Sequence, residues 1–204
     1  MKNRKNVNNN ISFAVLTGGL STRFGQNKLT FKIDEKSILD TVLDLIPPHF
    51  PLYIIGEKYT DKDVTAFKDI IPGLGPIGGI YTALKKIDSN YLFILGGDMP
   101  FISQGLLDAM IGLISKPGSD VIVPINKGFY EPLFAIYSKK VENTAAEQVQ
   151  KGEYKISDLF EKLKVLKVEE DFWRIHDSSG ESFININRIE DLNKLNEFYK
   201  KCSH

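Results

Sequence analysis

A glycine-rich segment with two cationic side chains, residues 16–28, is the part of the sequence with the clearest chemical capacity. It follows an apolar run and contains Gly18, Gly19, Gly25, Arg23 and Lys28. Glycines let backbone N–H groups approach a ligand and surround phosphate oxygens, and the two cations could offset the charge of a polyphosphate. The spacing matches neither a Walker A loop nor the dinucleotide fingerprint. The segment is therefore predicted to bind phosphate as a loop of another class, with a plain turn between a strand and a helix as the alternative.

Asp98 is the second candidate, because it closely follows the most apolar run of the chain, residues 91–95. Such a run is typical of a central parallel strand that is covered on both faces. Ligands of open parallel sheets lie beyond the carboxyl ends of the strands, so Asp98 should share an edge with the glycine-rich segment. A carboxylate beside a triphosphate commonly holds Mg²⁺, which takes only one or two carboxylates. Asp98 is therefore predicted to be a Mg²⁺ ligand, and the alternative is that it caps the turn before Pro100.

Residues 69–79 form a third candidate segment, with four glycines and two prolines in eleven residues. Prolines stiffen such a loop and glycines open it, which suits backbone contact with a nucleoside or with phosphates. A plain connection between two elements is the alternative.

Asn185 and Asn187 alternate with isoleucines near the end of the chain. On a strand, this period of two places both amides on one face and the isoleucines in the core. The amides could serve a ligand, or Asn187 could cap a helix that begins at Arg188.

Short apolar runs alternate with helical patterns along the chain. The predicted strands are residues 11–16, 51–56, 91–96, 120–124, 130–137, 165–168 and 182–186. The predicted helices are residues 38–46, 77–87, 104–114, 139–150, 157–163 and 188–201, with Ser37 and Ser103 as N-caps of the first and third. This alternation predicts an α/β fold, a three-layer α/β/α sandwich with a mostly parallel central sheet.

The composition excludes several classes of protein. The 204 residues suit one α/β domain, expected over residues 11–204. Because 26 basic residues balance 26 acidic ones, no nucleic-acid or anionic-membrane partner is expected. The single cysteine, Cys202, excludes an intrachain disulfide framework and a Cys-rich zinc site. Residues 1–10 are polar and are expected to form a disordered tail rather than a signal peptide or membrane anchor, which favours a cytoplasmic location.

The motifs together resemble the molybdenum cofactor guanylyltransferase family, whose members attach GMP to molybdopterin. The resemblance is carried, in the family's order, by residues 16–28, 75–79, 97–101, 131–135 and 183–192. The first motif is shared by many nucleotidyltransferases that act on sugars, isoprenoid precursors or molybdopterin. Gly-Asp-Met-Pro-Phe at 97–101 and the Asn-x-Asn-x-x-Glu-Asp-Leu ending narrow the resemblance to the molybdopterin branch.

The resemblance implies a Rossmann-like sandwich of the nucleotide-diphospho-sugar transferase type. The implied reaction transfers GMP from GTP to molybdopterin or Mo-molybdopterin, releases pyrophosphate and forms the guanine dinucleotide form of the molybdenum cofactor. Mg²⁺ is the implied cofactor, and proteins that mature molybdoenzymes are candidate partners. A phosphate monoester has a second pKa of about 6 and is mostly dianionic at neutral pH, so the attacking phosphate needs no general base. Catalysis would then depend on alignment and charge neutralisation.

The resemblance also implies a role for individual residues. Lys28 and Arg23 would bind the triphosphate and the charge that develops on pyrophosphate, and Asp98 would hold the metal. The nucleotide-binding set would further contain Leu16, Thr17, Gly18 and Gly19, with backbone contacts to guanine, and Asp69, with contacts to the nucleoside. Asn185 and Asn187 would lie on the molybdopterin side, with Lys127 and Tyr130 as further candidates.

Gly18 bears on the choice between a purine and a pyrimidine. Cytidylyl relatives tend to carry Ala-Ala-Gly where this chain has Thr17-Gly18-Gly19. The missing Cβ leaves room for guanine, so the resemblance implies GTP. A molybdopterin cytidylyltransferase, a sugar-phosphate nucleotidyltransferase and a non-catalytic carrier of GTP or molybdopterin remain as alternatives.

Three positions depart from the family's common pattern. Thr17 replaces the commoner Ala, and Asn27 replaces a frequent Asp before the lysine. Gly56-Glu57 stands where an Asn is often found after the second strand, so no binding residue is assigned there.

Overall fold

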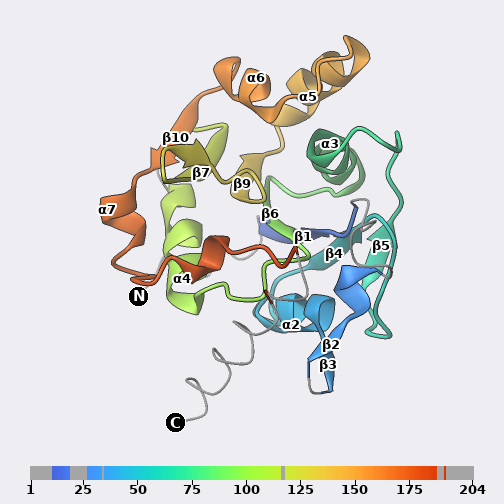
Figure 1. Cartoon of the computed structure of the whole chain (residues 1–204). Coiled ribbons are helices and arrows are strands. Elements are labelled where there is room, and N and C mark those ends of the chain that lie inside the picture. Colours follow the sequence, from blue (N-terminus) through green and yellow to red (C-terminus); the bar gives the residue numbers. More distant parts are fainter. Residues whose placement is uncertain (1–10, 19–26, 34, 116–117, 188–190, 192–204) are drawn as a thin grey trace.

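A computed structural model of the chain describes residues 11–18, 27–33, 35–115, 118–187 and 191. Its centre is an eight-stranded sheet in the order β10-β7-β9-β6-β1-β4-β5, with β8 paired to β7 (Figure 1). The strands of this sheet are β1 (Ile11–Leu16), β4 (Leu52–Ile55), β5 (Thr65–Phe67), β6 (Tyr91–Gly96), β7 (Val121–Asn126), β8 (Phe129–Tyr130), β9 (Phe134–Ser138) and β10 (Val165–Val168). A separate two-stranded hairpin consists of β2 (Lys32–Ile33) and β3 (Lys36–Ser37).

Most neighbouring strands of the large sheet are parallel. β1 lies parallel to both β4 and β6, β5 is parallel to β4, and β10 is parallel to β7. β9 lies antiparallel between β6 and β7, and β8 is antiparallel to β7. The carboxyl ends of β1, β4, β6 and β7 therefore share one edge of the sheet.

Helices cover both faces of the sheet, which gives the predicted three layers (Figure 1). One face packs against α2 (Ile38–Asp44), α4 (Gln104–Gly112) and α7 (Glu170–Trp173), and the other against α3 (Pro76–Lys86), α5 (Val141–Gln150) and α6 (Ile156–Glu161). Short 3₁₀ helices complete the described structure: η1 (Lys28–Thr30), η2 (Leu113–Ser115) and η3 (Glu181–Phe183). No helix in these described ranges is long and apolar enough to cross a membrane.

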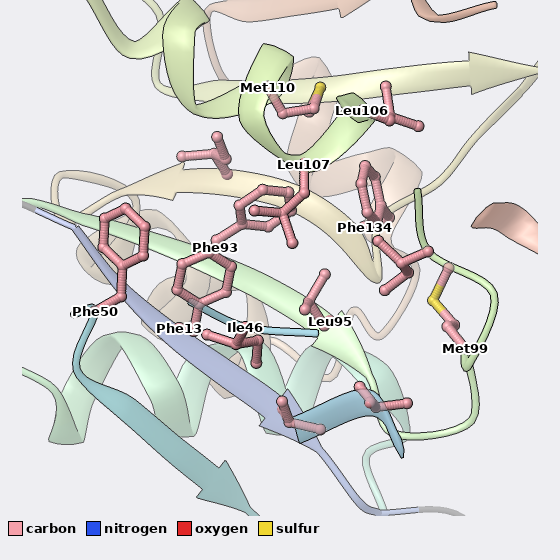
Figure 2. Packing of buried hydrophobic residues seen from close by; sticks show 14 of the residues in the cluster. Phe13, Ile46, Phe50, Phe93, Leu95, Met99, Leu106, Leu107, Met110 and Phe134 are labelled. Carbon is pink, nitrogen blue, oxygen red and sulfur yellow. The ribbon is translucent and has the colours of Figure 1, made fainter. Parts of the chain in front are cut away.

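The two faces are built by alternation along the strands. In β1, Phe13 and Val15 enter the core beneath α2 and α4, whereas Ala14 and Leu16 enter the core beneath α3. Figure 2 shows the first of these cores, in which Phe13 stacks on Phe93 at 5.1 Å between ring centroids and Phe93 meets Phe134 edge to face. This packing holds the two strands that carry the candidate site in one register.

Local signals set the helix starts. The Ser37 hydroxyl accepts a hydrogen bond from the Asp40 backbone N–H at 3.0 Å, and Ser103 caps α4 in the same way. α3 begins with Pro76 after Gly75, whose positive φ of 67° is readily adopted by glycine. The predicted caps are confirmed.

Several predicted elements differ from the structure. The strand expected at 130–137 is two strands, β8 and β9, separated by a turn at 131–133. The strand expected at 182–186 is wrong: η3 is followed by an extended stretch, in which Ile186 N–H bonds to the Asp98 carbonyl at 2.9 Å. Sequence patterns missed the short elements β2, β3, β5 and α7, which are too brief to show a period. The predicted tail at 1–10 and helix at 188–201 lie outside the described residues, apart from Asp191.

Candidate active site

The carboxyl ends of β1 and β6 meet at the centre of the sheet edge. Leu16 is in register with Gly96, and the Gly97 N–H donates to the Leu16 carbonyl at 2.9 Å. A Cβ atom at Gly97 would lie 3.0 Å from that carbonyl oxygen, so the two chain segments approach closely because residue 97 is glycine. The segment after β1 is thereby held against the loop that carries Asp98.

Lys28, Asp98 and Asn187 form one cluster at this edge. The Lys28 Nζ atom lies 2.5 Å from Oδ2 of Asp98 and 3.0 Å from Oδ1 of Asn187. The Lys28 and Asp98 side chains are each 18% exposed, so a ligand can reach the pair. The three residues come from segments separated by 70 and 159 positions from Lys28.

Lys28 is oriented by the turn in which it lies. Asn27 caps η1, since its side-chain oxygen accepts from the Leu29 N–H at 3.0 Å. Leu29 is buried in the core and anchors the turn. Asn27 thus performs the capping role that an Asp at this position would also perform.

Asp98 lies in a tight turn directly after β6. Met99 N–H bonds to the Gly96 carbonyl at 3.3 Å, and the Met99 side chain is buried. A Cβ atom at Gly96 would come within 2.9 Å of Oδ1 of Asp98. Among the residues described, the hydrogen-bond partner of the Asp98 carboxylate is Lys28 and not a backbone N–H of the turn, so the turn-capping alternative is wrong.

A second polar site lies beside Gly18. A Cβ atom built on Gly18 would be 3.4 Å from Oδ2 of Asp69, which follows β5. The other oxygen of Asp69, Oδ1, is buried and has no hydrogen-bond partner within the described part of the chain. Burial raises the pKa of the Asp69 carboxyl, because the charged form loses hydration. An unsatisfied buried acceptor at a sheet edge is suited to receive a donor from a ligand.

Thr17 has a structural role. Its hydroxyl donates to the carbonyls of Ile55, at 3.2 Å, and Glu57, at 2.8 Å, which ties the end of β1 to the loop after β4. Gly56 has a positive φ of 113°, and a Cβ atom there would lie only 2.7 Å from the Thr17 hydroxyl. Glycine at 56 is therefore needed by the backbone, and the Thr17 side chain is committed to the fold.

The remaining residues predicted to contact the nucleotide differ in whether their backbone groups are already bonded within the protein. The Leu16 carbonyl accepts the Gly97 N–H and the Thr17 N–H donates to the Ile55 carbonyl, so both groups are used within the sheet edge. Gly18 lies between this edge and Asp69. Gly19 and Arg23 lie outside the described residues, and their roles stay predictions.

The predicted molybdopterin side is not a single cluster. Asn187 contacts Lys28, whereas Asn185 is exposed and makes no hydrogen bond to Lys28 or Asp98. Lys127 occupies the tight turn between β7 and β8, where its N–H bonds to Glu170 at 2.8 Å. Tyr130 packs edge to face on Phe160 and lines a cavity of about 330 Å³ between α6 and β10. Tyr130 thus belongs to a different region from the ion pair.

One further polar group, Glu131, begins a motif of the family resemblance but is not among the predicted site residues. Glu131 is half-buried, and its Oε1 accepts from the Asn126 amide at 2.9 Å. Burial raises the pKa of its carboxyl. The turn that holds it leads to Leu133, whose carbonyl accepts the Gly96 N–H at 2.9 Å.

Known proteins are similar to this chain in sequence and in fold. Residues 13–167 match the model of the MobA-like NTP transferase domain. A probable molybdenum cofactor guanylyltransferase from Natranaerobius thermophilus is 36% identical over 96% of this chain and 99% of its own length. The same name is given to a Pyrococcus furiosus protein that is 30% identical, over 92% of this chain and 97% of that protein.

A solved structure agrees with these relatives. Molybdopterin-guanine dinucleotide biosynthesis protein A from Archaeoglobus fulgidus superposes with a TM-score of 0.82 at 26% identity, covering 93% of this chain and 99% of its own. The match to this family and the likeness of fold define the chain as a nucleotidyltransferase. The chain belongs to the MobA-like NTP transferases and, among them, to the molybdenum cofactor guanylyltransferase family.

Proposed function

We propose that the protein transfers GMP from GTP to molybdopterin with release of pyrophosphate. The observation that carries this proposal is the Lys28–Asp98 pair at the joined ends of β1 and β6, in a chain of this family. The pair places a cation and a hard oxygen ligand at one point, which is the combination that a triphosphate requires.

Asp98 is proposed as the Mg²⁺ ligand. Its carboxylate is accessible and already attracts a cation, since the Lys28 ammonium lies 2.5 Å from Oδ2. The described residues contain no group of three or more His, Cys, Asp or Glu placed to hold a metal. One carboxylate nevertheless suits Mg²⁺, which keeps several waters and takes further oxygens from substrate phosphates. When bound, the ion would neutralise charge on the phosphate oxygens.

The reaction itself places modest demands on the side chains. An oxygen of the molybdopterin phosphate would form a bond to the α-phosphorus of GTP, while the bond from that phosphorus to the pyrophosphate oxygen breaks. The dianionic phosphate needs no base. His49 and His176, the two histidines that the structure describes, pack against Phe50 and Phe172 and not at the ion pair. Lys28 would supply positive charge to the leaving pyrophosphate.

Asp69 is proposed to receive the nucleoside. Its buried Oδ1 has no hydrogen-bond donor among the described residues, and Gly18 lies beside the other carboxylate oxygen. Guanine presents two adjacent N–H donors, at N1 and at the 2-amino group, whereas cytosine presents one amino group. This difference supports GTP as the substrate. Because GTP is a cytoplasmic metabolite, the reaction is proposed to occur in the cytoplasm.

The decisive measurement compares GTP with CTP in the presence of Mg²⁺. GTP should raise the melting temperature much more than CTP, because a ligand at 100 times its dissociation constant adds about 2.7 kcal/mol to the free energy of unfolding. With molybdopterin added, GTP should yield pyrophosphate and the guanine dinucleotide. Equal shifts with both nucleotides would remove the case for guanine selectivity, and turnover of CTP in place of GTP would identify a cytidylyltransferase. Turnover of a sugar phosphate, or nucleotide binding without any turnover, would reject the proposal altogether.

A further inference from the structure

The position of Asn187 is set by its neighbours in the chain. Ile186 is fully buried, and its backbone N–H bonds to the Asp98 carbonyl at 2.9 Å. Phe183 packs edge to face against Trp173 and Phe134 in the core. The Asn187 N–H is bound by Oδ2 of Asp191 at 3.0 Å. The stretch before Asn187 is thus anchored in the core and to the Asp98 loop, and this anchoring places Asn187 beside that loop.

Its side chain is directed at Lys28. The Oδ1 atom of Asn187 accepts a hydrogen bond from Lys28 Nζ at 3.0 Å, beside the shorter contact of Nζ with Asp98. A lysine ammonium is a compact charge on a flexible stem with about 2 kcal/mol of rotamer entropy. Two acceptors restrict that stem more than one does.

The chemical type of the second acceptor is also informative. An amide oxygen is neutral, so it holds the ammonium without cancelling its charge and without repelling a triphosphate. Asp98 would give up part of its hold on Lys28 when it takes a metal ion, because the two cations compete for one carboxylate. Asn187 would then keep the ammonium near the phosphates.

We propose that Asn187 is a positioning residue for Lys28 and so acts on the nucleotide half of the reaction. This inference rests on the proposed function for the role of Lys28. It differs from the role on the molybdopterin side that the family resemblance implies for Asn187.

A double-mutant cycle tests whether Asn187 and Lys28 are coupled in binding a ligand that contains no molybdopterin. The affinity for inorganic pyrophosphate is measured by calorimetry in EDTA for the wild type, Asn187→Ala, Lys28→Ala and the double variant. Asn187→Ala should lower the affinity for pyrophosphate by about 10-fold, the size expected for the loss of a hydrogen bond to a charged group. The double variant should bind within about twofold of Lys28→Ala, because an effect that passes through Lys28 disappears with it. Melting temperatures of all four proteins check that folding is intact.

Asn143→Ala is the control, since Asn143 is an exposed amide on α5 that makes no hydrogen bond to Lys28. It should leave pyrophosphate affinity unchanged.

The single-turnover rate of GMP transfer should fall for Asn187→Ala and not fall further when the change is added to Lys28→Ala. Wild-type pyrophosphate affinity in Asn187→Ala, or fully additive losses in the double variant, would overturn the inference. If the wild-type protein binds pyrophosphate but does not modify molybdopterin, the proposed function is rejected. The pyrophosphate affinities of the four proteins would still test whether Asn187 acts through Lys28.

Discussion

At the scale of single residues, the candidate site contains a cation and an anion, Lys28 and Asp98, that form an ion pair. The Lys28 and Asp98 side chains are each 18% exposed, so water and ligands can still reach the ion pair. In the proposed reaction, Lys28 would act on the triphosphate and Asp98 on the metal ion. Substitutions at either residue should therefore change activity far more than stability.

Asp98→Ala should reduce turnover by about 100-fold or more, by analogy with the loss of one preorganised charge-stabilising group. The melting temperature should change much less than the rate, because among the described residues the partly exposed Asp98 carboxylate bonds to one side chain, that of Lys28. Steady-state rates and thermal denaturation of the same preparation measure both quantities. Asp108→Ala, which removes an exposed carboxylate on α4, is the control and should leave the rate unchanged. Retention of most activity in Asp98→Ala would exclude Asp98 as the metal ligand.

Lys28→Ala should slow nucleotidyl transfer more than it weakens GTP binding. The ammonium gains interaction as charge moves onto pyrophosphate, so its contribution belongs mainly to the transition state. Single-turnover kinetics at saturating GTP, together with a GTP titration of the same variant, separate the two effects. If affinity drops and the saturated rate is maintained, Lys28 is a ground-state anchor.

At the scale of elements, the site exists because two strands and the segments after them approach unusually closely. The Gly97 N–H bonds to the Leu16 carbonyl, and on the other face α3 lies on β1 where a Cβ atom at Gly79 would be 2.7 Å from the Leu16 side chain. Glycines at these contacts therefore determine how near the end of β1 lies to the loop that carries Asp98.

Gly97→Ala should destabilise the protein by about 1–3 kcal/mol, the usual effect of forcing an extra group into a packed region. The added Cβ atom would lie 3.0 Å from the Leu16 carbonyl oxygen, where backbone rather than a flexible side chain would have to move. Urea denaturation measures the change. Gly112→Ala in α4 is the matched control, since a Cβ atom there meets nothing within 4 Å, and it should be neutral or slightly stabilising. Equal stability of the two variants would show that the β1–β6 contact tolerates a wider gap.

At the scale of the whole molecule, the nucleoside contact proposed for Asp69 would come at a cost to the stability of the free protein. Its carboxylate has a buried oxygen without a partner among the described residues, which is unfavourable for the free protein. Burial raises the pKa of this carboxyl in the folded state. The folded protein then binds the proton more tightly than the unfolded chain, so Asp69 destabilises the fold at neutral pH, and this effect is relieved as the pH falls through the raised pKa.

Asp69→Asn should therefore raise the melting temperature at neutral pH, weaken GTP binding and remove this contribution to the pH dependence of stability. Thermal denaturation between neutral and mildly acidic pH, with and without GTP, tests the three effects together. Asp63→Asn, at an exposed position ahead of β5, should change none of them. A variant that is less stable than the wild type at neutral pH would contradict the assignment of an unsatisfied carboxylate.

The sequence alone determined the layers and the chemical character of the site. Residues 11–16, 91–96 and 165–168 are strands with the predicted bounds, because apolar runs and helix caps are read within a few neighbouring positions. The same local logic identified Lys28 and Asp98, since a charged residue beyond a buried strand must lie at the sheet edge. It failed at 182–186, where alternation of Ile and Asn suggested a strand that finds no partner strand in the sheet.

Only the tertiary structure decided which of these groups touch. The 70 positions between Lys28 and Asp98 and the 159 between Lys28 and Asn187 are bridged by the pairing of β1 with β6 and by the bond from Ile186 to Asp98. Three other features depend on the same long-range order. β9 lies antiparallel beside β6, and the Thr17 hydroxyl donates to the loop after β4. The Asp69 Oδ1 atom is buried without a hydrogen-bond partner among the described residues. Periodicity and caps report only local backbone preferences, whereas strand order and burial are settled by packing the whole chain around one sheet.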